Sequence, residues 1–131
     1  MTRQTGERRG RRWARWTLAV VFVGAGVMHF VAPAPYVRLV PSYLPGALLL
    51  VYASGAAEVL GGLGVLPRAT RRWAGLGLVA LLVVFLLVHV PMALNPADYA
   101  DLGLPAWVWW ARLPAQGLLI AWVWGATQPR R

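Results

Sequence analysis

Long apolar runs without charged residues dominate the chain, and they determine its predicted secondary structure. Three such runs cover residues 16–37, 39–57 and 73–97, and a shorter one covers 113–129 and extends outward to Trp109. A helix needs about 20 mostly apolar residues to cross the hydrocarbon core of a bilayer. With proline and glycine marking the helix ends, the runs predict four helices, at about 14–31, 45–66, 72–93 and 109–126.

The second of these helices is continuous only if a carboxyl group is admitted into the membrane. Glu58 lies in the middle of an otherwise apolar segment, 48–66. A charged group at the centre of a spanning helix costs about 3 kcal/mol on insertion scales, and the apolar neighbours offset that cost. We therefore expect an all-α fold, a polytopic membrane four-helix bundle over residues 14–126, with 1–13 and 127–131 as tails.

Composition and charge agree with a membrane location. Only 13% of the residues are charged, whereas a soluble domain carries about 25%. All 13 basic residues are arginine, and only Arg38 and Arg112 lie outside the N-terminal tail, the connection between the second and third helices, and the C-terminus. Positive charge collects on the cytoplasmic side of membrane proteins, so both termini are predicted to be cytoplasmic. Because the arginines lie at helix ends beside the lipid bilayer, we expect no nucleic-acid partner.

The chain contains no cysteine. This excludes disulfides, thiolate metal sites, iron–sulfur ligation and a C-x-x-C redox pair within this chain. Any thiol chemistry would belong to a partner protein.

Polar side chains inside the predicted spans are the candidate functional residues. Ionisable groups within a membrane usually face the protein interior and indicate function. Arg112 is predicted to open the fourth helix, with Gln116 four residues further inward, and Ser54 lies four residues outward from Glu58. These positions predict a polar stripe that runs from the outer surface to the middle of the membrane, made of His29, His89, Arg112, Gln116, Ser54 and Glu58.

The residues leave the roles within this stripe open. Glu58 is either a protonatable group or counter-charge to Arg112, or else a neutral carboxyl that only fixes packing. Helical rise places His29 and His89 at matching depths of about 25 Å, and Glu58 at about 12 Å. Two histidines at one depth could ligate a b-type haem, but nothing else in the chain indicates a haem site, so haem b is not expected. No residue set indicates a metal site or a catalytic reaction.

Small residues on the second helix predict a close helix–helix contact. They form two adjacent rows at four-residue spacing, one of Ala53, Ala57 and Gly61, the other of Ser54, Glu58 and Gly62.

Five short motifs follow one another over about residues 24–116. They are Gly26-Val27-Met28-His29-Phe30, Val40-Pro41-Ser42-Tyr43-Leu44-Pro45, Ser54-Gly55-Ala56-Ala57-Glu58, Gly61-Gly62-Leu63-Gly64-Val65-Leu66 and Arg112-Leu113-Pro114-Ala115-Gln116. In this order the motifs resemble the DoxX-like family of small bacterial membrane proteins. The chain departs from that family at 87–89, where relatives have Pro-Ala-Asn.

The resemblance implies a multi-pass protein of the bacterial cytoplasmic (inner) membrane that works beside a membrane-associated oxidoreductase. We expect a redox-associated accessory or anchor subunit that interacts with a quinone and is not an enzyme on its own. Arg112, His29 or Gln116 would donate to a quinone oxygen and Glu58 would handle a proton. The alternative is a small proton-coupled exporter of lipophilic cations, acting as a homo-oligomer, a dimer, through Glu58. A purely structural membrane protein is a third reading.

Overall fold

The prediction of an all-α protein is confirmed. A computed structural model describes residues 2–130, and the side chains of residues 5–130, and it contains no strand within that part of the chain. Met1, Arg131 and the side chain of Arg3, which belong to the predicted tails, lie outside the described part. The helices are α1 (Thr2–Val31), α2 (Pro33–Leu39), α3 (Ala47–Gly64), α4 (Arg68–Val84), α5 (Leu86–Leu94), the 3-10 helix η1 (Pro96–Leu102) and α6 (Ala106–Thr127).

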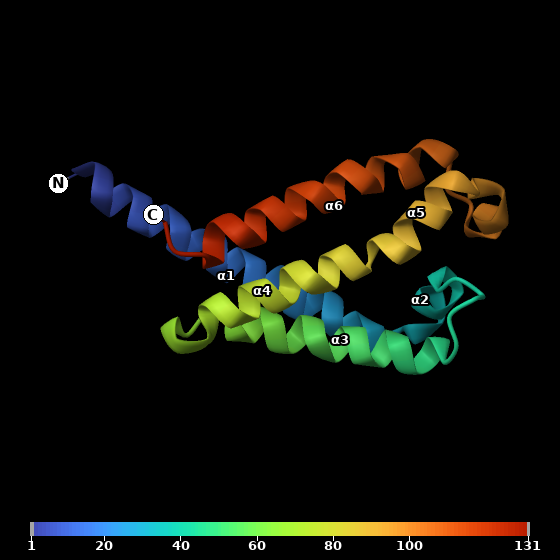
Figure 1. The fold of residues 1–131 in the computed structure, drawn as a ribbon, viewed down its shortest axis with the longest axis horizontal. Coiled ribbons are helices and arrows are strands. Elements are labelled where there is room, and N and C mark those ends of the chain that lie inside the picture. Colours follow the sequence, from blue (N-terminus) through green and yellow to red (C-terminus); the bar gives the residue numbers. More distant parts are fainter. Residues whose placement is uncertain (1, 131) are drawn as a thin grey trace.

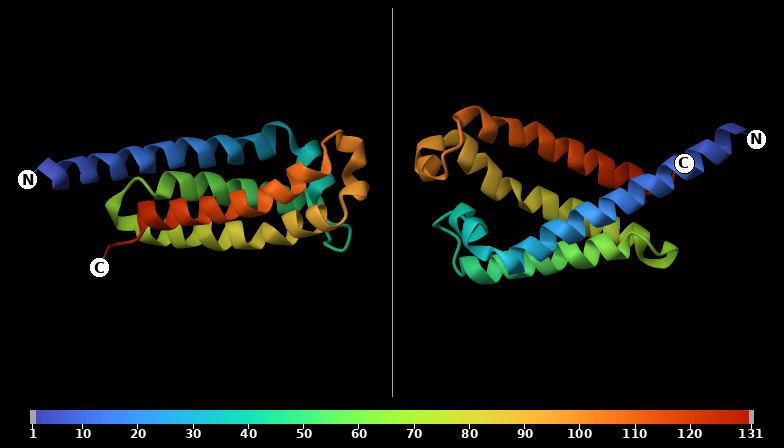
Figure 2. Two further views of the ribbon diagram at one scale, coloured as in Figure 1. Left: turned by 90° about the horizontal axis from the view of Figure 1, so that it is seen from above. Right: turned by 180° about the vertical axis from the view of Figure 1, so that it is seen from behind.

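The long helices run side by side along one axis (Figures 1 and 2). Helix α1 packs mainly on α3, α3 on α4, and α6 on both α4 and α5. Both chain ends and the α3–α4 connection lie together at one end of the molecule (Figure 1). We call this the arginine-rich end. Helices α2 and η1 lie at the other end, which we call the capped end, and the N-terminal part of α1 projects beyond its neighbours.

The helix boundaries differ from the predicted ones at several places. Helix α3 is two residues shorter at each end than predicted, and α4 begins at Arg68 rather than near residue 72. Three further differences have identifiable causes. Helix α1 begins at Thr2 rather than near residue 14, because the arginine-rich segment has good helix propensity and contains no proline. The third predicted helix is interrupted at Phe85, which separates α4 from α5. Helix α6 begins directly after Pro105, so Arg112 lies inside the helix rather than at its start.

Three helical segments are long and apolar enough to cross a membrane, namely Thr5–Val31, Ala47–Gly64 and Arg68–Leu94. At most 28% of the most apolar stretch of each is buried within the protein. Large apolar side chains such as Val20 and Leu60 are instead about 70% exposed. Apolar helices that direct such side chains outward are typical of proteins surrounded by lipid, so the chain is a membrane protein. Helix α6 is less apolar because it contains arginine, glutamine, proline and several tryptophans.

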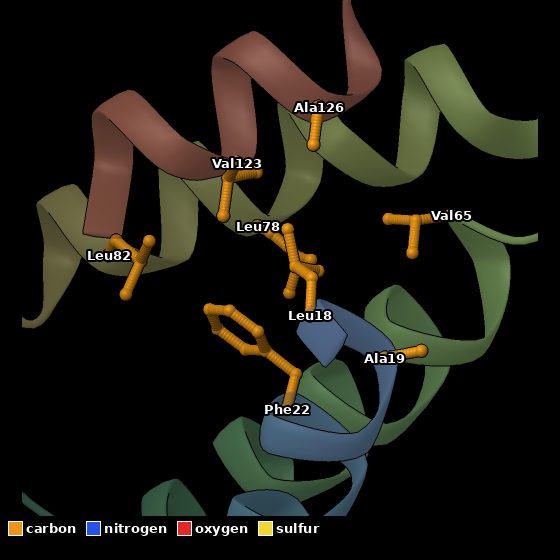
Figure 3. Close-up of a cluster of buried hydrophobic side chains, with 8 residues drawn as sticks. All are labelled: Leu18, Ala19, Phe22, Val65, Leu78, Leu82, Val123 and Ala126. Carbon is orange, nitrogen blue, oxygen red and sulfur yellow. The ribbon is translucent and has the colours of Figure 1, made fainter. Parts of the chain in front are cut away.

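Two apolar clusters hold the helices together. The larger one joins α1, α4, α6 and the end of α3, and its side chains interdigitate closely (Figure 3). The smaller one lies at the capped end between α5, η1 and α6. The first contains Leu18, Ala19, Phe22, Val65, Leu78, Leu82, Val123 and Ala126, and the second Met92, Ala93, Tyr99 and Trp109.

Arginines cap helix C-termini at the arginine-rich end. A terminal guanidinium nitrogen of Arg11 donates to the carbonyls of Gly125 and Gln128 at 3.0 and 2.7 Å. Arg71 donates to the carbonyls of Val65 and Leu66 at 2.9 and 2.6 Å. The last carbonyls of a helix lack intrahelical donors and carry partial negative charge. These arginines therefore fasten α1 to α6, and α4 to the end of α3.

Candidate functional site

The candidate site is built on a backbone contact between α1 and α3. A Cβ atom added to Gly26 would lie 2.5 Å from the carbonyl oxygen of Gly55, and one added to Gly55 would lie 2.6 Å from the Cβ of His29. Only glycine allows two helices to approach this closely. The side chains that flank the two glycines are therefore pressed together.

The predicted close contact exists, and the row of Ser54, Glu58 and Gly62 makes it together with Gly55, which was in neither predicted row. On α3, Gly55 and Gly62 face α1, whereas Ala53 and Ala57 are exposed. Gly61 faces α4 instead, where an added Cβ would lie 2.5 Å from a Leu78 methyl group. The rows were assigned from spacing alone, and spacing does not indicate which side of a helix meets which neighbour.

His29 and Glu58 meet at this contact. The Nε2 atom of His29 lies 3.4 Å from Oε2 of Glu58, and the two side chains are 8% and 7% exposed. Nδ1 of His29 lies 3.0 Å from the carbonyl oxygen of Val51 and 3.2 Å from the hydroxyl of Ser54, which itself donates to the Val51 carbonyl at 2.9 Å. Three predicted site residues, His29, Ser54 and Glu58, thus form one cluster.

The hydrogen bond to Val51 determines which ring nitrogen of His29 carries a proton. A carbonyl oxygen can only accept, so Nδ1 must donate. Nε2, which faces Glu58, is therefore an acceptor in the neutral ring. Glu58 Oε2 has no hydrogen bond of standard geometry, although it is fully covered.

The facing atoms of His29 and Glu58 accommodate one proton between them. Without that proton, two electron-rich atoms and a buried carboxylate charge would oppose each other, which is costly in an apolar environment. With it, either the carboxyl donates to the ring, or an imidazolium donates to a carboxylate. The geometry is that of a group that can hold and release a single proton.

The predicted difference in depth between these two residues was too large. It was measured from the ends of the helices, and α1 extends further than expected. Leu18 packs in the same cluster as Val65, so His29 lies about 16 Å and Glu58 about 10 Å beyond that level. Their side chains close the remaining gap.

Helix α2 covers the histidine. The ring of Tyr36 lies on that of His29, with 4.1 Å between centroids and an angle of 54°. Beside this pair, Phe30 and Tyr52 stack at 5.3 Å. Aromatic rings from α1, α2 and α3 therefore lie on His29 or next to it.

An ion pair connects α2 to η1 across the capped end. Arg38 donates from Nε to one oxygen of Asp101 at 2.9 Å and from a terminal nitrogen to the other at 2.6 Å. Its guanidinium also lies 5.2 Å from the centre of the Tyr99 ring. The bidentate guanidinium lowers the pKa of Asp101 below its ordinary value. The contact is exposed, so its strength depends on salt.

The structure does not bring Gln116 to Glu58. The amide of Gln116 donates to the carbonyl of Leu82 at 2.6 Å, between α6 and α4. Leu82 lies just before the interruption at Phe85, where the regular helical hydrogen bonding is broken. The predicted stripe therefore separates into two parts, because Gln116 satisfies a backbone group between α4 and α6.

His89 and Arg112 belong to the second part. His89 is 7% exposed, and its Nδ1 atom is covered and lacks a hydrogen-bond partner. Arg112 is exposed and lies within electrostatic range of His89 and of the Tyr36 hydroxyl. Through these two electrostatic interactions, Arg112 connects His89 with Tyr36, whose ring covers His29 in the first part of the stripe.

The environment of His29 does not suit an axial haem ligand. Nδ1 is engaged by Val51 and Ser54, and Nε2 faces Glu58. A ligating histidine needs one free ring nitrogen. Among the described residues, no group of three or more histidine, cysteine, aspartate or glutamate side chains could hold a metal ion.

Sequence reasoning missed Tyr36 and Val51 as parts of the site. Tyr36 lies between the first two predicted helices, outside the spans from which the candidate residues were taken. The Val51 carbonyl is a backbone group, and no side-chain pattern reveals it. Gly26 could have been found, since it lies within the same short motif as His29.

A comparison with known protein families assigns the chain to one of them. A family model described as "Domain of unknown function (DUF8561)" matches residues 18–127. The chain belongs to this family. All six predicted site residues lie inside the matched DUF8561 segment, and the arginine-rich start of α1 lies outside it. No curated protein and no solved structure matches the chain.

Proposed function

We propose that the chain is a four-helix membrane bundle that serves as a redox-associated accessory subunit, in which the His29–Glu58 pair exchanges a proton with a quinone. The observation that carries the proposal is the single-proton pair at the glycine contact of α1 and α3. The proposal includes the resemblance to DoxX-like proteins and the location that it implies, the bacterial cytoplasmic membrane.

Helix α6 is the fourth span in this proposal. Its 22 residues give a length of about 33 Å, and it packs along α4 and α5. Exposed Leu118 and Trp124 suit a lipid-facing surface. Both termini lie at the arginine-rich end (Figure 1), as an even number of spans requires. The positive-inside rule then favours a cytoplasmic location for both termini.

A quinone suits the chemistry of the site. Its carbonyl oxygens need hydrogen-bond donors, and its reduction or oxidation needs a group that gives or takes protons. The covered Oε2 of Glu58 has no hydrogen bond of standard geometry, so this carboxyl group is able to take up or release a proton. The aromatic rings of Tyr36 and Phe30 offer apolar surfaces close by.

The protein's role in this proposal is limited to binding and proton exchange. When a quinol is oxidised, two electrons and two protons leave it. The His29–Glu58 pair accommodates one proton, and the second passes to water. In this proposal the electrons pass to a redox centre of a partner oxidoreductase, since the chain has no cysteine for a thiol or iron–sulfur centre of its own. The chain is therefore expected to act with a partner and not as an enzyme alone.

The proposal is tested by mild purification from native membranes, followed by mass spectrometry of the proteins that accompany the chain. Quinone retained by the complex is extracted and quantified in parallel. We expect a stoichiometric oxidoreductase, and a quinone content that falls in Glu58→Gln and stays unchanged in the matched variant Asp98→Asn, which alters an exposed acid. Absence of both partner and quinone would overturn the proposal.

A proton-coupled exporter is the competing function for the same carboxyl group. It predicts that cells expressing the chain export lipophilic cations, and that Glu58→Gln abolishes export at unchanged protein level. Glu58 is covered by α1 and opposed by His29, so a lipophilic cation that bound its carboxylate directly would have to displace the histidine. Export that depends on Glu58 would decide for the exporter.

The topology is tested by labelling single cysteines, because the chain has none of its own. Ala69, beside the α3–α4 connection, and Ala100, in η1, are both exposed. We expect a membrane-impermeant maleimide to label Ala100→Cys in intact cells and Ala69→Cys only after permeabilisation. Labelling of both in intact cells would contradict the proposed topology.

A further inference from the structure

One surface of α1 points away from the other helices and changes its chemistry in a regular order. At the arginine-rich end, Arg9, Arg12, Trp13 and Trp16 line a hollow of about 380 Å³. The two indoles are 66% and 51% exposed. Further along the same helical face lie valines such as Val20, which is 69% exposed. The surface thus passes from guanidinium groups to indoles to aliphatic side chains.

We infer that this surface, the α1 lipid face, binds an anionic phospholipid. The order of side chains matches the order of groups in such a lipid, in which phosphate is followed by the glycerol region and then by acyl chains. Arginine pairs with phosphate through directed hydrogen bonds. Indoles favour the interfacial level of a membrane. The inference requires only that α1 crosses the membrane, and it is independent of the quinone proposal.

The dimensions agree with one leaflet. Trp16 and Val27 are eleven residues apart, which corresponds to about 16 Å along the helix. Half of a hydrocarbon core of about 30 Å is close to this distance. If Trp16 marks the edge of the apolar region, Arg9 and Arg12 lie at headgroup level, in the N-terminal part of α1.

Arg9 and Arg12 have no acidic partner within the described part of the protein. Residues 1–31 contain a single acid, Glu7, and it pairs with Arg130. By contrast, Arg11 faces the other side of α1 and binds carbonyls at the end of α6. The α1 lipid face therefore presents two positive charges that are free to meet an anionic headgroup.

The test is native mass spectrometry of the full-length protein mixed with equal amounts of phosphatidylglycerol and phosphatidylcholine. We expect a preference for phosphatidylglycerol that the double variant Arg9→Gln, Arg12→Gln lowers about 25-fold, equivalent to about 2 kcal/mol for two arginines. The matched control is Arg68→Gln, Arg72→Gln, which removes the same net charge from exposed positions of α4 and is expected to retain the preference. Equal losses in both double variants, or no preference in the parent protein, would overturn the inference.

Two further arms identify the ligand and guard against misfolding. Inorganic phosphate at matched ionic strength is not expected to displace the lipid, and displacement that depends on Arg9 and Arg12 would assign the site to a free anion. The variant Arg9→Lys, Arg12→Lys keeps the charges and is expected to keep most of the preference. Helical content by circular dichroism is compared across all variants. If the double glutamine variant does not fold, the single variants Arg9→Gln and Arg12→Gln are measured instead, and each is expected to lower the preference about five-fold, equivalent to about 1 kcal/mol.

Discussion

Gly55→Ala tests the contact that brings the proton-holding pair together. The added Cβ would lie 2.6 Å from the Cβ of His29 and 2.9 Å from the carbonyl oxygen of Gly26. Backbone forms part of this obstruction, so α1 and α3 must move apart by roughly 1 Å to restore ordinary contact. Such overpacking costs about 1–3 kcal/mol, and the higher helix propensity of alanine returns up to about 1 kcal/mol. We expect a net loss of about 1–2 kcal/mol in the free energy of unfolding.

The matched control is Gly117→Ala in α6, where an added Cβ meets nothing within 4 Å. This variant is expected to be unchanged or up to about 1 kcal/mol more stable. Both free energies are measured by titrating the protein from a mild detergent into sodium dodecyl sulfate and following helical content by circular dichroism. If Gly55→Ala is as stable as Gly117→Ala, the close contact of α1 and α3 is refuted.

Two other contacts give separate predictions. Gln116→Leu leaves the buried Leu82 carbonyl without its donor, so we expect a loss of about 1–3 kcal/mol in the same titration, and a loss below about 0.5 kcal/mol would contradict the assigned role. Because Arg38 lowers the pKa of Asp101, the stability from this pair is present above the ordinary carboxyl pKa of about 4 and is lost as the pH falls through the lowered value. Thermal unfolding against pH should show this loss in the parent protein and a weaker one in Arg38→Met, and identical profiles would exclude the contribution.

The apolar pattern predicted the helical class and the approximate positions of the long helices, because each of them must present about 20 apolar residues to lipid. The apolar pattern did not predict those helix ends that depend on contacts with other parts of the protein. The interruption at Phe85 was missed because it separates two apolar stretches with no change in composition. The start at Thr2 was missed because the arginine-rich segment was assigned to a tail.

The candidate site was predicted in part for similar reasons. His29, Ser54 and Glu58 were recognisable as polar residues within apolar helices, and the structure brings them together. Gln116 was placed with them because helical spacing cannot tell a ligand-binding amide from one that satisfies a carbonyl. The glycines that determine the distance between α1 and α3 act through the absence of a side chain, and a single sequence does not show which helices meet at them.

Opposite sides of α1 have different proposed functions, because the α1 lipid face lies on one side and His29 on the other. Arg9 and Trp13 point outward, while Leu18 and His29 face the other helices. An anionic lipid bound outside would help to fix the height of α1 in the membrane. Because the glycine contact fixes α1 to α3, that height also sets the depth of the His29–Glu58 pair in the membrane.

The proposed function requires that the His29–Glu58 pair exchanges a proton with a quinone. Infrared difference spectroscopy measures this directly, because the carbonyl stretch of a protonated carboxyl group appears or disappears when the pair gains or loses its proton. The purified protein is mixed with a soluble quinol, and the quinol is then oxidised by added ferricyanide, which accepts the two electrons. We expect a carboxyl band that changes on oxidation of the quinol in the parent protein and in Asp98→Asn, and that is absent in Glu58→Gln. No change in the parent protein, or the same change in Glu58→Gln, would contradict the account.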